Sequence, residues 1–304
     1  MALILLRFGE ISLKSPRIRR QFSKALVNNI QRMFMSASIE CLTWEEWGRI
    51  FIETNDFPKA AALLERAFGV VSFSEVIQVD CVQGDIDRAV LGLAREMLRP
   101  GSRFAVRCRR VGNHPFTSQE MAAKVGEAIL DANPQLGLKV DLTDPEVMIE
   151  LEIRDKKAYI YHTRRQGPGG MPLSTQGGVL AIIEPGDLRD VARTASAFYL
   201  VMKRGCKVFP LCLYPEGRGG DEEEGLLRVL RRFDPDIRMR YMAEERDPNK
   251  ALSDFIKKDG GGSVWVSARG LQECLFDIKA TVFYPLIGLE GHYLDQLFSK
   301  VMTG

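Results

Sequence analysis

Alternating apolar and polar stretches in the first 75 residues predict a small sheet with two helices. Short apolar runs have the length of strands, and longer segments show helical periodicity. The order along the chain is β-α-β-β-α-β, which closes by itself into one sheet. The predicted strands are Leu3–Phe8, Ile39–Leu42, Arg49–Ile52 and Val70–Val79, and the predicted helices are Pro16–Met35 and Pro58–Phe68.

The next ninety residues predict a second module that mixes helices and strands. Its last two strands read as a hairpin around the charged turn Asp155-Lys156-Lys157. Ser118-Gln119-Glu120 carries an N-cap signal for the second helix. The predicted elements are a helix at Gly84–Leu98, a strand at Arg103–Cys108, a helix at Ser118–Ala132, and strands at Val147–Ile153 and Ala158–His162.

The stretch GPGGMPLSTQGG (Gly167–Gly178) is rich in Gly, Pro, Ser and Thr, which predicts a linker. Beyond it, strand-like and helical runs alternate, which favours a doubly wound, mostly parallel sheet. The fold class is therefore α/β with α+β N-terminal modules. We expect a ferredoxin-like domain at 1–75, a second domain at 76–167, a linker at 168–178 and an α/β domain at 179–304. The strands predicted in the last domain are Val179–Ile183, Lys207–Leu213, Ile237–Tyr241, Ser263–Val266 and Thr281–Pro285.

Composition changes this picture little. With 45% hydrophobic and 27% charged residues, the 304-residue chain is typical of a soluble globular protein. No apolar run reaches the length of a membrane span and no signal peptide is apparent, so we expect a cytoplasmic protein without a membrane partner. The six cysteines form no CxxC pair and there are only three histidines, which argues against a zinc or other metal site.

Basic residues gather in three places although the net charge is only +2. Such clustering predicts a polyanionic partner, and RNA recognised by shape and backbone suits it. Plain solvated faces are the alternative, and Phe116 beside His114 could stack on a nucleotide or anchor the core. We expect the cations of the first two modules to converge on one face, with Lys14, Arg17, Arg19, Arg20 and His114 among the RNA-binding residues. The clusters are Lys14, Arg17, Arg19, Arg20 and Lys24; Arg107, Arg109 and Arg110; and Arg154, Lys156, Lys157, Arg164 and Arg165.

Three stretches resemble the 4-thiouridine tRNA sulfurtransferases, a family also known as thiamine-biosynthesis proteins. They are GEISLKS (Gly9–Ser15), FAVRCRRVGNHPFTSQEMAAKVGEAI (Phe104–Ile129) and Val140–Leu180. The resemblance implies that residues 76–167 are a THUMP domain, that the first two modules cradle tRNA with the acceptor region on the THUMP domain, and that a PP-loop (ATP-pyrophosphatase) domain follows. The RNA contacts carried over are Arg107, Arg109, Arg110, Lys124, Arg164, Arg165 and the glycines Gly167, Gly169 and Gly170, where a sugar-phosphate backbone could come close or the chain could hinge.

The resemblance weakens at the phosphate loop. The family carries Ser-Gly-Gly-x-Asp-Ser after the first strand of its catalytic domain, where small residues expose N–H groups to the pyrophosphate of ATP. Here the loop is Glu184-Pro185-Gly186-Asp187-Leu188-Arg189-Asp190, in which only Gly186 fits. Pro185 lacks an N–H, and carboxylates stand where phosphates would lie. One such like-charge contact at ~4 Å costs roughly 1 to 4 kcal/mol, although magnesium could bridge the charges.

A second nucleotide signature, Thr-Gly-Glu-x-Leu-Gly-Gln, is also altered in VSARGLQEC (Val266–Cys274), where Ala268, Arg269 and Glu273 replace the glycine, glutamate and glutamine. The sequence stops before the segment in which the family has a reactive cysteine, and Cys206 in RGCKV is expected to pack. We therefore expect Gly186, Asp187 and Ser267 to mark a degenerate nucleotide site, with no catalytic residue and no cofactor.

Three functions follow as hypotheses. The preferred one is a tRNA-binding protein in or alongside tRNA modification, without ATP-dependent chemistry of its own, so whether it is an enzyme stays open. A protein partner that supplies catalysis and a homodimer stay open as well. The alternative is an active, divergent ATP-dependent tRNA sulfurtransferase that uses ATP and magnesium. The third is an interaction protein with no role in RNA binding.

Overall fold

The computed structural model describes residues 1–9, 15–46, 48–184, 186–214, 219–241, 264–269 and 281–303. In this part of the chain the strands form one sheet of nine strands and one of five. The chain divides into two compact units, which are described separately. Unit 1 contains Met1–Arg7, Cys41–Phe57 and Ser72–Gln166, and unit 2 contains Phe8–Glu40, Pro58–Val71 and Gly167–Gly304.

The nine-stranded sheet has the order β2-β3-β1-β4-β8-β7-β5-β6, and β9 pairs with β4. The predicted order β-α-β-β-α-β of the first module is confirmed, although β2 begins two residues later than expected. The strands are β1 (Ala2–Phe8), β2 (Cys41–Glu46), β3 (Arg49–Thr54), β4 (Val70–Asp80), β5 (Arg103–Val111), β6 (Lys139–Val140), β7 (Val147–Arg154), β8 (Lys157–Tyr161) and β9 (Arg165–Gln166). The helices of the first two modules are α1 (Pro16–Ser36), α2 (Phe57–Leu64), α3 (Gln83–Met97) and α4 (Ser118–Ala132), and a short 3-10 turn covers Pro134–Leu136.

Strand β4 belongs to both modules. It lies beside β1 in the sheet order, and its last four residues, Ile77–Asp80, pair antiparallel with β8. No turn signal interrupts this 11-residue strand, so the sheet continues through the point at which the sequence predicts a domain boundary.

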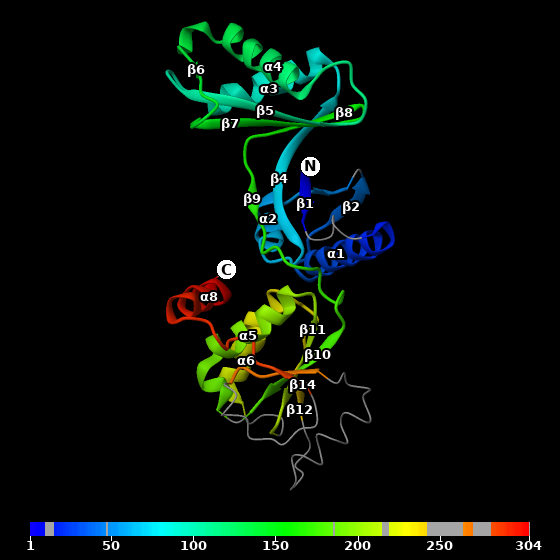
Figure 1. The fold of residues 1–304 in the computed structure, drawn as a ribbon, viewed down its shortest axis with the longest axis vertical. Helices are drawn as coiled ribbons and strands as arrows, with labels where there is room; N and C mark the ends of the chain where they lie inside the picture. Colours follow the sequence, from blue (N-terminus) through cyan, green and yellow to red (C-terminus); the bar gives the residue numbers. More distant parts are fainter. Residues whose placement is uncertain are drawn as a thin grey trace. The chain divides into compact units, whose positions relative to one another are not determined.

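Helices α3 and α4 lie on one face of the sheet that contains β5, β7 and β8 (Figure 1). They bury an apolar core with Phe104, Ile149 and Leu151 from the strands and Val125 from α4. The N-cap of α4 is Thr117, one residue before the position that the sequence predicts. Its side chain accepts the Glu120 N–H at 3.1 Å, and the Glu120 carboxylate accepts the Thr117 N–H at 2.7 Å.

The five-stranded sheet of unit 2 is parallel and has the order β12-β11-β10-β13-β14. The predicted parallel α/β sheet is thus confirmed. In chain order the strands run 3-2-1-4-5, so the direction of winding reverses between β10 and β13. The elements are β10 (Gly178–Ile183), a 3-10 turn (Asp187–Asp190), α5 (Val191–Lys203), β11 (Lys207–Cys212), α6 (Gly220–Arg231), β12 (Arg240–Tyr241), β13 (Val264–Val266), β14 (Thr281–Phe283) and α8 (Gly291–Thr303).

The core of unit 2 takes in residues from outside the α/β domain. The ring of Phe68 lies 5.2 Å from that of Tyr199 and 5.5 Å from that of Phe233. Leu173, from the predicted linker, is 4% exposed in the same core. The linker also bonds to the domain through its backbone, because Met171 N–H donates to the Lys203 carbonyl at 3.0 Å. It is therefore a packed segment of unit 2. In the described residues, none of the helices is both long enough and apolar enough to cross a bilayer.

Candidate functional site

Strand alternation divides the arginines of β5 between two faces. The parallel pairing with β7 is unbroken and sets Arg107 beside Glu150 and Arg109 beside Glu152. Both arginines are exposed and lie on the face that α3 and α4 leave uncovered. We call this helix-free face of β5 and β7 the arginine face. Arg110 points to the helix side of the sheet, so the expected convergence of all three arginines on one face is wrong.

Arg110, His114 and Lys124 lie around the start of α4. Arg110 Nη1 donates to the Gly112 carbonyl at 3.4 Å, and Arg110 and Lys124 both help to lower the pKa of Glu120, after the hydrogen bonds from Thr117. The His114 ring lies 5.3 Å from that of Phe116, and Phe116 packs against the core of α3 and α4. Phe116 is thus a core anchor, one of the two roles that the sequence left open.

Two further arginines follow β8. Arg164 Nη2 pairs with Glu150 Oε2 at 2.6 Å, and its side chain is 42% exposed. Its charge is therefore next to the arginine face. The guanidinium of Arg165, on β9, lies 5.9 Å from the centre of the Phe73 ring.

A buried ionic cluster lies against the arginine face, and the sequence did not predict it. Glu152 is 1% exposed and contacts the guanidinium groups of Arg7, Arg49 and Arg154; we call these four residues the Glu152 network. Arg49 Nε lies 2.9 Å from Glu152 Oε1, Arg7 Nη2 lies 3.6 Å from Glu152 Oε2, and Arg7 Nη1 donates to Ser74 Oγ at 3.1 Å.

Burial alone would raise the pKa of Glu152, but Arg49 and Arg154 outweigh it and hold the pKa below its usual value. The network joins strands from both N-terminal modules, and pairing over such sequence distances leaves no local signal in the sequence.

The remaining predicted RNA contacts belong to unit 2. Arg17, Arg19 and Arg20 are exposed at the start of α1, and Lys14 lies outside the described residues. Gly167 and Gly170 are needed by the fold itself, because a Cβ on Gly167 would collide with the Val70 carbonyl and one on Gly170 with the Lys203 carbonyl. Gly169 faces open space, so of the three glycines it is the one whose surroundings leave room for a ligand.

The loop after β10 and the loop after β13 flank the reversal of the sheet, where open α/β sheets usually bind ligands. Described side chains of the two loops pair with each other here. Arg269 Nε lies 2.6 Å from Asp187 Oδ1, and Arg269 Nη1 lies 2.8 Å from Glu184 Oε2 in an ion pair that lacks hydrogen-bond geometry. Glu184 is 2% exposed and Asp187 8% exposed. Ser267, whose hydroxyl accepts the Arg269 N–H at 3.2 Å, is also buried.

Polar groups of this loop are engaged within the protein. The Glu184 N–H donates to Asp187 Oδ2 at 2.7 Å. Asp190 caps α5 by accepting the Arg193 N–H at 2.9 Å, and Arg193 Nε donates to the Ala268 carbonyl at 3.0 Å. Gly186 has the positive φ of 102° that a tight turn requires. Pro185 and Glu273 lie outside the described residues.

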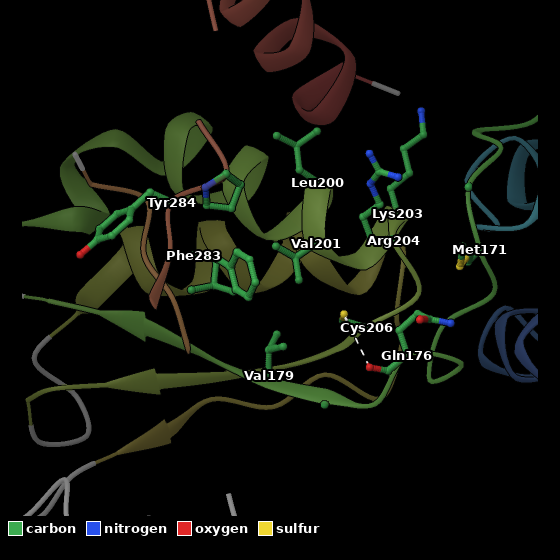
Figure 2. A pocket seen from close by; sticks show the side chains of 14 residues that line it. Met171, Gln176, Val179, Leu200, Val201, Lys203, Arg204, Cys206, Phe283 and Tyr284 are labelled. Atoms are coloured by element: carbon green, nitrogen blue, oxygen red, sulfur yellow. Dashed lines mark hydrogen bonds between the residues drawn. The ribbon is translucent and has the colours of Figure 1, made fainter. Parts of the chain in front are cut away.

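A cavity of about 960 Å³ lies at the opposite, amino-terminal end of β10, between that strand and α5 (Figure 2). Cys206 lines it together with Val179, Val201 and Phe283. Burial raises the pKa of the Cys206 thiol, and its Sγ lies 4.0 Å from the Gln176 carbonyl. Cys206 is therefore neither activated nor close to the crevice, which agrees with a packing role.

Comparison with known proteins identifies the family. The ThiI ferredoxin-like domain model matches residues 3–74, and the THUMP domain model matches residues 84–163. A probable tRNA sulfurtransferase from Saccharolobus islandicus is 35% identical over 341 aligned positions, which cover 100% of this chain and 87% of that protein. The chain belongs to the tRNA sulfurtransferase family. A probable tRNA sulfurtransferase from Methanobrevibacter smithii is 40% identical over 213 residues, 68% of this chain. That match covers 52% of the relative. The chain therefore spans about half the length of this relative.

Solved structures agree with this assignment. PH1313 from Pyrococcus horikoshii superposes with a TM-score of 0.83 at 28% identity and covers 99% of both chains. A 4-thiouridine synthetase, crystallised as an RNA complex with bound ATP, superposes with a TM-score of 0.77 at 20% identity, over 99% of this chain and 85% of that one. The second likeness shows the shared fold. The predicted ferredoxin-like, THUMP and parallel-sheet domains are thereby confirmed, whereas their exact boundaries stay predictions.

Proposed function

We propose that this tRNA sulfurtransferase family member binds tRNA and acts in or alongside tRNA modification without ATP-dependent chemistry of its own. The proposed absence of ATP-dependent chemistry rests on one observation: Arg269 forms ion pairs with Glu184 and Asp187 in the crevice. In this arrangement carboxylates take the place of phosphates, and a side chain of the protein neutralises them. Nucleotide binding would have to break these buried contacts.

The proposed binding of tRNA rests on family membership and on exposed cations. Arg107 and Arg109 stand clear of α3 and α4 in the THUMP-like part of unit 1, and Arg164 adds its charge beside Glu150. The related 4-thiouridine synthetase was crystallised with RNA. We place the acceptor region of the tRNA on these arginines, and a partner protein would supply the catalytic step.

The alternative is an active, divergent sulfurtransferase that binds ATP and magnesium. It is favoured by the alignment over 87% of the Saccharolobus relative and by the fold shared with a synthetase that holds ATP. The two proposals make opposite predictions for nucleotide binding, which can be measured directly.

Two measurements on the full chain test the proposal. Gel shifts with total tRNA are expected to show binding that duplex DNA does not match and that weakens steeply with salt, because phosphate contacts release counterions. Calorimetry with ATP and magnesium is expected to show no saturable heat. Equal binding of tRNA and DNA would overturn the proposal that the chain binds tRNA specifically. Saturable ATP binding that Asp187→Ala alters would overturn the proposed absence of ATP-dependent chemistry and favour the alternative.

A further inference from the structure

The Glu152 network holds more positive charge than its geometry needs. Arg7, Arg49 and Arg154 all contact Glu152, and Arg109 follows next to it on the neighbouring strand. The register also sets Glu46 opposite Arg49. Even with Glu46 counted in full, four guanidinium groups face two carboxylates.

Two features accompany this surplus of positive charge. Arg7 is 8% exposed, and its Nη2 atom has no hydrogen-bond partner. Burial and the neighbouring Arg154, Arg109 and Arg7 also lower the pKa of Arg49 to about 10, in spite of the attraction of Glu152. A buried charge that is not fully compensated destabilises the folded state.

An anion at the surface of the cluster would offset it. Arg109 is exposed, and the Arg49 side chain, 12% exposed, reaches the buried carboxylate from the neighbouring module. We infer that the arginine face holds a phosphate group of RNA between Arg109 and Arg49, above the Glu152 network. This inference rests on the proposed tRNA binding and deepens it. The buried arginines would act at a distance, through their field, while Arg109 and Arg49 make the contact.

The chemistry of the site suits a phosphate rather than a base. A guanidinium pair offers several N–H donors to a tetrahedral oxyanion, and the nearby ring of Trp44 is already stacked on Phe51 at 5.5 Å. The site would therefore fix the register of the RNA backbone and would carry little sequence information.

The test compares Arg109→Gln with Arg88→Gln, in both of which one exposed arginine of unit 1 loses its charge. Arg88 lies on α3, on the opposite side of the sheet, and its side chain is 81% exposed. By fluorescence anisotropy with total tRNA, Arg109→Gln is expected to weaken binding about tenfold and to reduce the slope of log K against log salt by about 1. Arg88→Gln is expected to change affinity less than twofold. Equal effects of the two variants would overturn the inference.

A second readout tests the involvement of Arg49. Its Nε–H group bonds to Glu152, so its NMR resonance should shift when inorganic phosphate or a short RNA is added, and Arg109→Gln should abolish the shift. A resonance that stays fixed would also overturn the inference, even if Arg109→Gln weakened binding. Failure of the proposed function looks different, because the unmodified protein would then bind tRNA no better than duplex DNA.

Discussion

At the residue scale, a single buried carboxylate organises the basic part of the molecule. Glu152 contacts three arginines that come from β1, β3 and β7. The sequence shows Arg154 within a basic run but gives Arg7 and Arg49 no distinguishing context. Their role depends on contacts between residues far apart in the chain, such as Arg49 and Glu152, which are 103 positions apart, and local patterns carry no such information. Arg107 and Arg109 could be predicted as exposed cations, because they are polar positions on an otherwise apolar strand.

Glu152→Ala is expected to lower the free energy of unfolding by about 3 to 5 kcal/mol, because it leaves buried arginines without their counter-ion. Urea unfolding at neutral pH measures this loss. Glu150→Ala is the matched control: its partner Arg164 is 42% exposed, so a loss of about 1 kcal/mol or less is expected.

The pH dependence has a definite sign. The folded-state pKa of Glu152 is depressed, so its stabilisation is present above the unfolded value of about 4.3 and is lost as the pH falls through the folded pKa. The difference in stability between the wild type and Glu152→Ala should therefore be constant near neutrality and shrink in acid. A difference that grew on acidification would contradict this assignment.

At the scale of elements, the sequence predicts the regular parts well and the glycine-rich segment poorly. The bounds of α4, Ser118–Ala132, agree with the prediction, because its apolar periodicity and N-terminal cap are local signals. The linker is predicted from composition alone, which cannot reveal that Leu173 is buried or that Gly170 touches α5. Glycine indicates conformational freedom, and here the fold uses that freedom to bring two backbones together.

Gly169 and Gly170 allow two roles of glycine to be measured separately: adopting a positive φ, and leaving room for a neighbouring backbone. Both have positive φ, 67° and 74°, so alanine costs roughly 1 kcal/mol at either position. A Cβ on Gly170 also meets the Lys203 carbonyl, whereas one on Gly169 meets nothing within 4 Å. We expect Gly170→Ala to destabilise unit 2 by about 2 to 4 kcal/mol and Gly169→Ala by about 1 kcal/mol in urea unfolding. Equal losses of unfolding free energy in the two variants would mean that the segment can move away from the Lys203 carbonyl without cost.

At the scale of the whole molecule, sequence order and physical units differ. The predicted domains are consecutive, yet Phe8–Glu40 and Pro58–Val71 belong to unit 2 together with the α/β domain. Phe68 shows why, since its ring completes an aromatic cluster with Tyr199 and Phe233. Helical periodicity identified Phe68 as an apolar residue but could not show which core it enters. The carboxylates of the loop after β10 are visible in the sequence, but their ion pairs with Arg269 are not.

Phe68→Ala should therefore destabilise unit 2, although the residue lies in the first module by sequence. Emptying a buried phenyl site costs about 3 to 5 kcal/mol, and Phe68 is 2% exposed. Phe283→Ala, at a ring that is 54% exposed, should cost about 0.5 kcal/mol or less. Urea unfolding followed by hydrogen exchange of α5 amides would locate the loss. Unchanged exchange in α5 would contradict the assignment of Phe68 to this core.

The position of strand β4 limits how the chain can be divided into stable fragments. Since its final residues form one side of the ladder with β8, a fragment that starts at the THUMP match at residue 84 leaves the amide and carbonyl groups of β8 bare along that edge. Such a fragment would tend to self-associate edge to edge. The two N-terminal modules share one sheet through β4, so a THUMP domain separated from the first module would need another strand to cover this edge of β8.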